Sequence, residues 1–311
     1  MRVLLALGGN AMTNAEGRAR PEDQIAAAAQ AAGAVADLVV EGWEVVVTHG
    51  NGPQVGNLLV KNELAAAVVP PVPLDWCGAQ TQATLGFVLM NALEAAFTAR
   101  GVERRTATVV TRTLVAWDDP GFTRPSKPIG RYLPGAEAAL LVEHGETWED
   151  RGTKGWRRVV ASPEPLEIVD AAAILTLVGA GFLVVANGGG GIPVVVDADG
   201  ELHGVEAVID KDLGAALLGH TVGADVLVIA TDVPHAVLHF GTPSAVDLEH
   251  VSVADLRRYA SEGHFASGSM GPKVEAACRF VESGAGRSVI TNLDSIVAAV
   301  AGDAGTVVAP D

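Results

Sequence analysis

Short apolar runs alternate with longer alanine-rich segments along almost the whole chain, and this alternation constrains the fold more than any other feature. The apolar runs are rich in Val, Ile and Leu, as strands buried on both faces of a sheet are. We predict seven strands: Val3–Leu7, Glu44–Thr48, Thr106–Thr111, Phe182–Ala186, Val226–Ala230, Arg287–Ile290 and Thr306–Val308. The pattern predicts an α/β fold with an open, mainly parallel sheet.

The alanine-rich segments are predicted helices that cover both faces of this sheet, which makes the architecture an αβα sandwich. Several begin with Pro or Asp and end near a Gly, which are common residues at helix starts and ends. The seven predicted helices are Pro21–Val40, Asp75–Thr98, Ile168–Val178, Asp212–Leu218, Val253–Glu262, Pro272–Glu282 and Asp294–Val300.

One stretch, residues 117–165, interrupts the alternation because Pro, Gly, Trp and charged residues are dense in it. Its segment Glu149–Trp156 has the composition of a hairpin turn. A long surface loop is the alternative, but structureless loops of this length are uncommon in compact domains. We therefore predict one domain over residues 1–311 with a small inserted subdomain that acts as a lid.

The chain is strongly acidic, with 37 Asp and Glu against 21 Lys and Arg and a net charge of −16. Such a charge repels phosphate backbones and anionic lipids at long range, and we find no basic patch that would override it. Binding to nucleic acid or to a membrane surface is therefore not expected. The apolar share of 49% is enough for a buried core and excludes disorder as the main state.

Cysteine usage and hydropathy both point to the cytoplasm. Cys77 and Cys278 stand far apart without metal-binding or redox spacing, as in a reducing compartment. The apolar run at the N-terminus is too short for a signal peptide, and no window has the roughly 18 to 20 apolar residues of a membrane span. We expect two buried thiols in a cytoplasmic protein.

Three glycine clusters follow predicted strands: Gly8-Gly9-Asn10, Gly50–Gly56 and Gly188–Gly191. Loops at the carboxyl ends of parallel strands form the ligand crevice of an open sheet. Without a Cβ, their backbone N–H groups can converge on an anion. Tight turns alone would also explain one such cluster, but three in equivalent places favour an anion site. The chain contains neither a P-loop nor a GxGxxG motif, which disfavours P-loop NTPases and Rossmann dehydrogenases.

Lysine is scarce, with five against sixteen arginines, so each lysine position is informative. Lys127, Lys211 and Lys273 lie in segments shaped by Gly, Pro or Asp, whereas Lys61 and Lys154 suit a solvated surface. Phosphoryl transfer depends on placed cations, because charge develops on three phosphoryl oxygens. The three lysines are therefore candidate catalytic residues.

Other polar residues near these motifs allow a structural and a catalytic interpretation. Asp212 either caps the helix that follows it or orients the lysines. His49 either packs at a strand end, which we favour, or acts as a general base. Ser269 and Thr48 lack the sequence context of a hydrolase nucleophile.

Seven segments in order along the chain resemble the carbamate kinases of the amino acid kinase family. They are Ala6–Ala11, Thr48–Gly56, Pro73–Ala79, Lys127–Gly130, Gly188–Pro193, Glu206–Asp212 and Gly268–Glu275. The resemblance implies a homodimeric cytoplasmic phosphotransferase of arginine metabolism. It would transfer a phosphoryl group between ATP and carbamate, giving ADP and carbamoyl phosphate.

The resemblance also implies which residues form the site. The half formed by residues 1–180 would bind carbamate or carbamoyl phosphate through Gly8, Gly9, Asn10, Gly50, Asn51 and Gly52. The half formed by residues 181–311 would bind ATP or ADP through Asp210, Lys211, Gly268, Met270 and Lys273. Lys127 would reach in from the insert, Asp212 would organise the lysines, and Mg²⁺ would be held mainly by the nucleotide phosphates.

Two departures from the family pattern keep other functions open. Val233–Pro243 lacks an acid, two tyrosines and a lysine of the usual pattern, with Pro234, Val237, Phe240 and Thr242 in their places. This segment would border the adenine pocket. Trp76 leaves room for a changed acceptor pocket or a dimer contact. A relative that phosphorylates another small carboxylate, phosphonate or phosphate, or a non-catalytic metabolite-binding protein, remains an alternative.

Overall fold

A computed structural model describes residues 1–9, 20–266 and 268–311. Its centre is an eight-stranded sheet in the order β15-β17-β16-β12-β1-β2-β9-β3. Neighbouring strands run parallel except β16 and β17, which confirms the mainly parallel sheet. The strands are β1 Arg2–Leu7, β2 Glu44–His49, β3 Thr106–Thr108, β9 Leu183–Val185, β12 Val226–Thr231, β15 His250–Ser252, β16 Arg287–Asn292 and β17 Thr306–Ala309.

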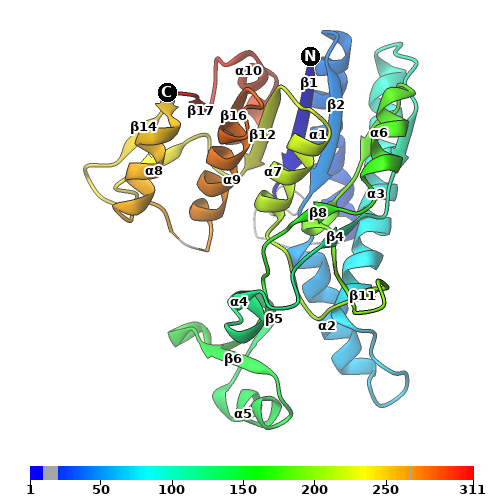
Figure 1. The fold of residues 1–311 in the computed structure, drawn as a ribbon, viewed down its shortest axis with the longest axis vertical. Helices are drawn as coiled ribbons and strands as arrows, with labels where there is room; N and C mark the ends of the chain where they lie inside the picture. Colours follow the sequence, from blue (N-terminus) through cyan, green and yellow to red (C-terminus); the bar gives the residue numbers. More distant parts are fainter. Residues whose placement is uncertain (10–19, 267) are drawn as a thin grey trace.

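Helices cover both faces of this sheet, as the sequence predicts (Figure 1). Alternate residues of β1 enter two different cores: Val3, Leu5 and Leu7 face one helix layer, and Leu4 and Ala6 face the other. Each fully buried Val or Leu contributes about 1.5–3 kcal/mol. The first layer contains α1 Pro21–Val40, α3 Leu74–Ala99 and α10 Ile296–Ala301, and the second contains α6 Ala171–Gly179, α7 Lys211–Thr221, α8 Val253–Ser261 and α9 Met270–Glu282.

The predicted insert forms a folded unit with its own antiparallel sheet, in the order β5-β7-β6. Its small core contains Leu133, Ala138 and Trp148. The predicted hairpin at Glu149–Trp156 is confirmed, because β6 and β7 pair on either side of it. In Figure 1 the unit projects from the body, away from both termini. Its elements are α4 Pro120–Thr123, β5 Lys127–Leu133, α5 Gly135–Glu143, β6 Thr147–Asp150, a 3₁₀ turn at Gly152–Lys154 and β7 Trp156–Val160.

The root of the insert packs on α2 (Gly52–Ala65) and on the start of α3. Ile129 and Val160 of the insert share an apolar cluster with Val55 of α2 and Cys77 of α3. The sequence prediction did not include α2 among the helices. Pro53 in its first turn, just after Asn51 at the N-cap, was a usable helix-start signal.

Two shorter sheets complete the chain. One has the order β11-β10-β4-β8, from β4 Arg112–Leu114, β8 Glu167–Ile168, β10 Ile192–Val196 and β11 Leu202–Gly204, and the other pairs β13 Ala236–Leu238 with β14 Val246–Leu248. None of the helices in the described ranges has the length and hydropathy needed to cross a membrane.

Most predicted elements differ from the observed ones by one to three residues at an end, and the structure explains three of these differences. The strand Thr106–Thr111 ends at Thr108, because Thr111 turns its backbone toward the side chain of Gln82. The helix predicted from Ile168 starts at Ala171, since Ile168 belongs to β8. The helix predicted from Asp294 begins with a 3₁₀ turn, and α10 starts at Ile296.

Candidate active site

The first two glycine loops meet at the carboxyl ends of the adjacent strands β1 and β2. A Cβ on Gly50 would lie 2.6 Å from the backbone N of Gly9 and 2.8 Å from Cδ of Lys211. Gly50 is therefore required for close approach of these three residues. Gly8 and Gly50 use their own N–H groups in the sheet, donating to Ala230 O and Leu7 O. Their contribution to a ligand site is space, and Asn10 lies outside the described residues.

The third glycine loop, after β9, packs against the second loop. A Cβ on Gly189 would lie 2.3 Å from Nδ2 of Asn51, and one on Gly188 would lie 2.4 Å from the His49 ring. Gly189, Gly190 and Gly191 have φ values of 69°, 89° and 94°, which favour glycine. The three predicted clusters thus converge at one edge of the sheet.

Asn187, just before this loop, holds the crevice together and was missed by the sequence analysis. It adopts a left-handed backbone conformation with φ of 55° and is buried. Its Nδ2 donates to Gly214 O at 3.0 Å, and its Oδ1 accepts from Thr113 Oγ1 at 3.0 Å. Its backbone O accepts from Thr48 Oγ1. An Asn that precedes a glycine run was the available signal, since Asn tolerates this conformation better than most residues.

Asn51 and Gln82 fix the second and third loops from the side of α3. Asn51 Nδ2 donates to Thr81 Oγ1 at 2.8 Å. Gln82 Nε2 donates to Gly188 O at 2.9 Å and to Thr111 O at 3.1 Å. These buried bonds hold the loops in place before any ligand binds. Gln82 was also missed, because nothing near it in sequence indicates partners so far along the chain.

The three candidate lysines converge on two neighbouring carboxylates. Lys127 Nζ lies 2.6 Å from Asp210 Oδ2, and Lys211 Nζ lies 2.5 Å from Asp212 Oδ1. Lys273 Nζ lies 3.4 Å from Asp212 Oδ2 and 3.2 Å from Ser269 O. The cluster joins the insert, the start of α7 and the start of α9. With three cations and two anions, this group of five side chains has a net positive charge.

Asp210, and not Asp212, caps α7, which corrects the structural interpretation of Asp212. Asp210 Oδ1 accepts from the backbone N–H groups of Asp212 and Leu213. The Asp212 side chain is 4% exposed and accepts from Lys211 and Lys273 instead. Asp212 is therefore placed to orient the two lysines.

Burial and charge act in opposite directions on these groups. Burial raises the pKa of Asp210, but the charge and hydrogen bond of Lys127 outweigh it and hold that pKa below its ordinary value. Burial lowers the pKa of Lys273, and the nearby Lys211 ammonium lowers it further, against the opposing effect of Asp212.

His49 has the packing role that we favoured. It is 2% exposed, and its Nδ1 lies 3.0 Å from Gly50 O, to which the ring donates. Burial lowers its pKa to about 4, so the ring is neutral near pH 7. Thr48 uses its hydroxyl on Asn187 O, so it is not poised as a nucleophile.

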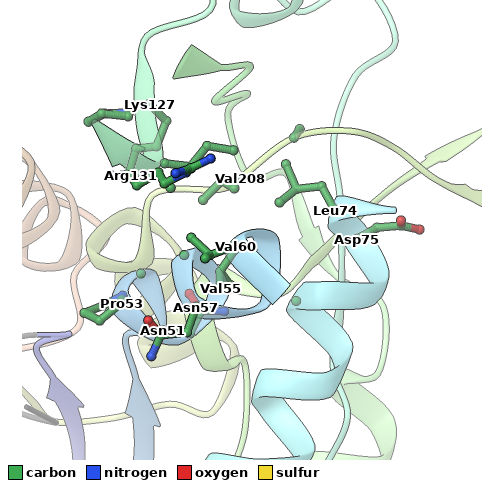
Figure 2. Close-up of a pocket in the computed structure, with 18 of the residues that line it drawn as sticks. Asn51, Pro53, Val55, Asn57, Val60, Leu74, Asp75, Lys127, Arg131 and Val208 are labelled. Atoms are coloured by element: carbon green, nitrogen blue, oxygen red, sulfur yellow. The ribbon is translucent and has the colours of Figure 1, made fainter. Parts of the chain in front are cut away.

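A cavity of about 720 Å³ opens between the glycine loops, α2, α3 and the insert (Figure 2). Asn51, Gly52 and Gly189 line its inner part. Lys127 and Arg131 approach from the insert, on the opposite side from α2 in Figure 2. This arrangement can hold a small anion beside the lysine cluster.

A model of the amino acid kinase family matches residues 1–292. The chain belongs to the amino acid kinase family. Carbamate kinase of Thermococcus kodakarensis is 47% identical over 309 residues, covering 98% of each chain, and that of Pyrococcus furiosus is 44% identical over 314 residues, covering 99% of each. The structure of carbamate kinase from Giardia lamblia bound to AMP-PNP matches with a TM-score of 0.93 at 40% identity, covering 100% of this chain and 98% of that one. The predicted resemblance is confirmed.

Gly268 and Met270, which the family pattern assigns to the nucleotide, flank Ser269, whose backbone O accepts from Lys273. Gly268 is exposed, and Met270, the first residue of α9, packs against the second core. Lys61 and Lys154 are exposed, as predicted, and Cys77 and Cys278 are buried free thiols.

The segment that departs from the family pattern is largely exposed. It forms β13 and then a turn in which Phe240 is 76% exposed. His239 has a φ of 53°, and its ring packs edge-on against His264 with 4.4 Å between centroids. Trp76 is also exposed and is not among the residues that line the cavity, so it does not reshape the acceptor pocket.

The insert is tied to α9, the helix that carries Lys273. Arg279, further along α9, forms an ion pair with Glu164 at the end of the insert. The backbone N–H of Glu164 donates to Asp119 Oδ2 at 3.0 Å, which joins the two ends of the insert. These contacts connect α9 to the root of the insert.

Proposed function

We propose that this member of the amino acid kinase family is a carbamate kinase. It would transfer a phosphoryl group between ATP and carbamate, giving ADP and carbamoyl phosphate. The observation that carries the proposal is the convergence of Lys127, Lys211 and Lys273 beside the crevice formed by the glycine loops. Similarity to carbamate kinases over nearly the whole chain supports the same substrate.

The reaction would need positioned charge more than it needs a base. A carbamate oxygen attacks the γ-phosphorus in line, a new P–O bond forms, and the bond to the bridging oxygen breaks with its electron pair leaving on ADP. Carbamate is already anionic, so no proton has to be removed. The neutral His49 and the occupied hydroxyl of Thr48 suit such a mechanism.

Within this mechanism Lys211 and Lys273 would exchange part of their contact with Asp212 for phosphoryl oxygens. Asp212 would keep their ammonium groups in place, because its two oxygens are held by the two lysines. Lys127 would stabilise charge from the acceptor side. Donors fixed in this way stabilise the transition state without reorganising as charge develops.

Mg²⁺ fits this site as a nucleotide-bound ion. The carboxylates at the site, Asp210 and Asp212, are already bound to lysines. Within the described ranges, one group of three potential ligands, Asp197, Glu201 and His203, lies on the β10–β11 hairpin outside the cavity lining. Mg²⁺ usually keeps waters and binds substrate phosphates, so it would neutralise phosphate charge there.

We also propose that residues 1–180 provide most of the acceptor site and residues 181–311 the nucleotide site, with the insert as a lid. Gly189 and Val208 line the cavity too, so the division is not strict. Trp76 and Phe87 are exposed on α3, and their spacing of eleven residues places them on one face. These two exposed aromatic side chains suit a homodimer contact, and the free thiols suit the cytoplasm.

Two assays test the proposal. Purified protein with Mg²⁺ should form ATP from ADP and carbamoyl phosphate, and should form ADP from ATP when ammonium bicarbonate supplies carbamate. Absence of both activities in folded protein that binds ADP would contradict it. A parallel screen of acetate, phosphonates and phosphate as acceptors would reveal a different substrate.

A further inference from the structure

The first turn of α7, which carries Lys211 and Asp212, packs directly on the third glycine loop. A Cβ on Gly214 would lie 2.7 Å from Cα of Gly190, so no side chain fits between the helix and the loop. Gly214 is three residues after Lys211, which is within one helical turn of about 3.6 residues. The position of Lys211 therefore depends on what holds this turn against the loop.

The side chain of Asn187, just before the loop, joins it to this turn. Asn187 is 1% exposed, and its Nδ2 donates to the backbone O of Gly214 at 3.0 Å. A carbonyl oxygen only accepts, so the nitrogen of the amide is the atom that faces α7. Its Oδ1 then faces Thr113, whose Oγ1 donates to it at 3.0 Å. Both ends of the amide are bonded, and its orientation is fixed.

The backbone of Asn187 is anchored to β2 and to the segment before β4. Its O accepts from Thr48 Oγ1 at 3.0 Å, and its N–H donates to Thr111 Oγ1 at 2.9 Å. Thr48 lies two residues before Gly50, where a Cβ would meet Lys211 Cδ at 2.8 Å. Asn187 therefore connects the strand that leads into the second glycine loop with the helix that carries Lys211.

This position makes three demands, and asparagine meets all of them. The backbone has φ of 55° and ψ of 32°, a left-handed conformation that Asn, Asp and Gly adopt more readily than other residues. The side chain also donates to Gly214 and accepts from Thr113. An ionised Asp can accept but cannot donate, and Gly has no side chain for either bond. The amide of Asn187 therefore makes a specific contact with α7 besides suiting the turn.

We propose that Asn187 is a positioning residue for phosphoryl transfer, which holds Lys211 and Asp212 in place through its hydrogen bond to the first turn of α7. It acts through the helix, since its Nδ2 and Oδ1 are both bonded within the protein. The inference rests on the proposed function for the reaction that Lys211 serves. Misplacing such a group is costly, because an error of about 1 Å can lower a rate by about 10²-fold.

Asn187→Gly tests this role, because glycine keeps the left-handed backbone and removes the amide. We expect kcat for ATP formation from ADP and carbamoyl phosphate to fall by about 10- to 100-fold. Both KM values should change little, which is the pattern of an interaction that acts in the transition state. Urea unfolding of the same samples gives the folded fraction, so that kcat is compared per folded molecule.

Ser288→Ala is the matched control for loss of a buried hydrogen bond. Ser288 is 0% exposed on β16, and its Oγ donates to the backbone O of Ala277 in α9 at 3.0 Å. Both variants should lower the midpoint of urea unfolding, but only Asn187→Gly should lower kcat. An unchanged kcat in Asn187→Gly, or an equal fall in Ser288→Ala, would overturn the role of Asn187.

A crystal structure of Asn187→Asp tests the position of Lys211 without turnover, and it serves if Asn187→Gly does not fold. This variant keeps the shape of the side chain, and an oxygen replaces the Nδ2 donor opposite Gly214 O. In crystals grown near pH 9, where the carboxyl is ionised, we expect the first turn of α7 to move away from Gly190 and Lys211 to be displaced. Lys211 in its original place would overturn the role. If the unaltered protein forms no ATP, the proposed function fails, and this structure still decides the role of Asn187.

Discussion

The site has two basic ends that hold their charges differently: an inner end, formed by the glycine loops and the lysine cluster, and an outer end, where the insert lines the cavity. At the inner end the side chains of Lys273 and Asp212 are 12% and 4% exposed, and the loops around them are fixed by buried hydrogen bonds. At the outer end Arg131 is 48% exposed, on a small sheet that packs on the body through one apolar cluster. The difference teaches that the sheet edge holds its charges buried and fixed, whereas the insert holds its charges exposed to solvent.

The largest effect should come from the inner end. Lys211→Ala should lower kcat by about 10²- to 10³-fold, the effect of removing a placed transition-state donor. Lys154→Ala, in the insert, removes an equal charge from an exposed turn and should leave kcat unchanged. Steady-state ATP formation from carbamoyl phosphate measures both. A similar kcat for the two variants would contradict the proposal that Lys211 stabilises the transition state.

A buried histidine at the inner end should make stability depend on pH. The pKa of His49 falls from 6.5 to about 4 on folding, so the unfolded chain binds the proton first. The contribution of the neutral, buried His49 ring to the free energy of unfolding is complete above pH 6.5. As the pH falls toward 4, this contribution decreases by about 3 kcal/mol. Carboxylates with lowered pKa values, such as Asp210, change the free energy of unfolding only at pH values below this range.

Urea unfolding at pH 7, 5.5 and 4.5 measures this slope. His49→Gln should flatten it, and His144→Gln, at the exposed C-cap of α5, should not. An unchanged slope in His49→Gln would show that burial of this ring does not govern the pH dependence.

A smaller effect is expected from close packing of the loops. Gly50→Ala would place a Cβ against Gly9 and Lys211, which costs about 1–3 kcal/mol in unfolding free energy and displaces the lysine. Gly179→Ala, where a Cβ would meet nothing within 4 Å, is the control. Chemical denaturation with activity measurements compares them. Equal stability and activity would mean that the crevice is looser than its geometry indicates.

The smallest effect should come from the link between the ends. Arg279→Gln breaks the ion pair with Glu164, but both side chains are about 40% exposed, so the cost should be under about 1 kcal/mol. We expect KM for the acceptor to rise a few-fold with little change in kcat. A double-mutant cycle with Glu164→Gln measures the interaction energy between Arg279 and Glu164. An interaction energy of zero would show that this ion pair does not couple the insert to α9.

Much of this organisation could be predicted from sequence because it depends on local patterns. All seven predicted strands lie in the central sheet, since continuous apolar runs need burial on both faces. The glycine clusters were located because loops after parallel strands share one edge. The three lysines stood out because lysine is scarce and because their neighbours are Gly, Pro or Asp.

What could not be predicted depends on contacts between distant residues. Gln82 bonds to Gly188, 106 positions away, and Asn187 bonds to residues from three other elements. Both Asp210 and Asp212 are suited to the N-cap of α7 by residue type. Which of them caps the helix depends on the direction of the backbone before it. The break after Thr108 likewise depends on Gln82, which holds Thr111.

A crystal structure with ADP, Mg²⁺ and aluminium fluoride as a mimic of the transferring phosphoryl group tests the central claim most directly. The account predicts that the mimic lies beside the loops that contain Gly9 and Gly50, with Nζ of Lys211 and Lys273 within hydrogen-bond distance of it. A mimic bound elsewhere, with both lysines still directed only at Asp212, would contradict it.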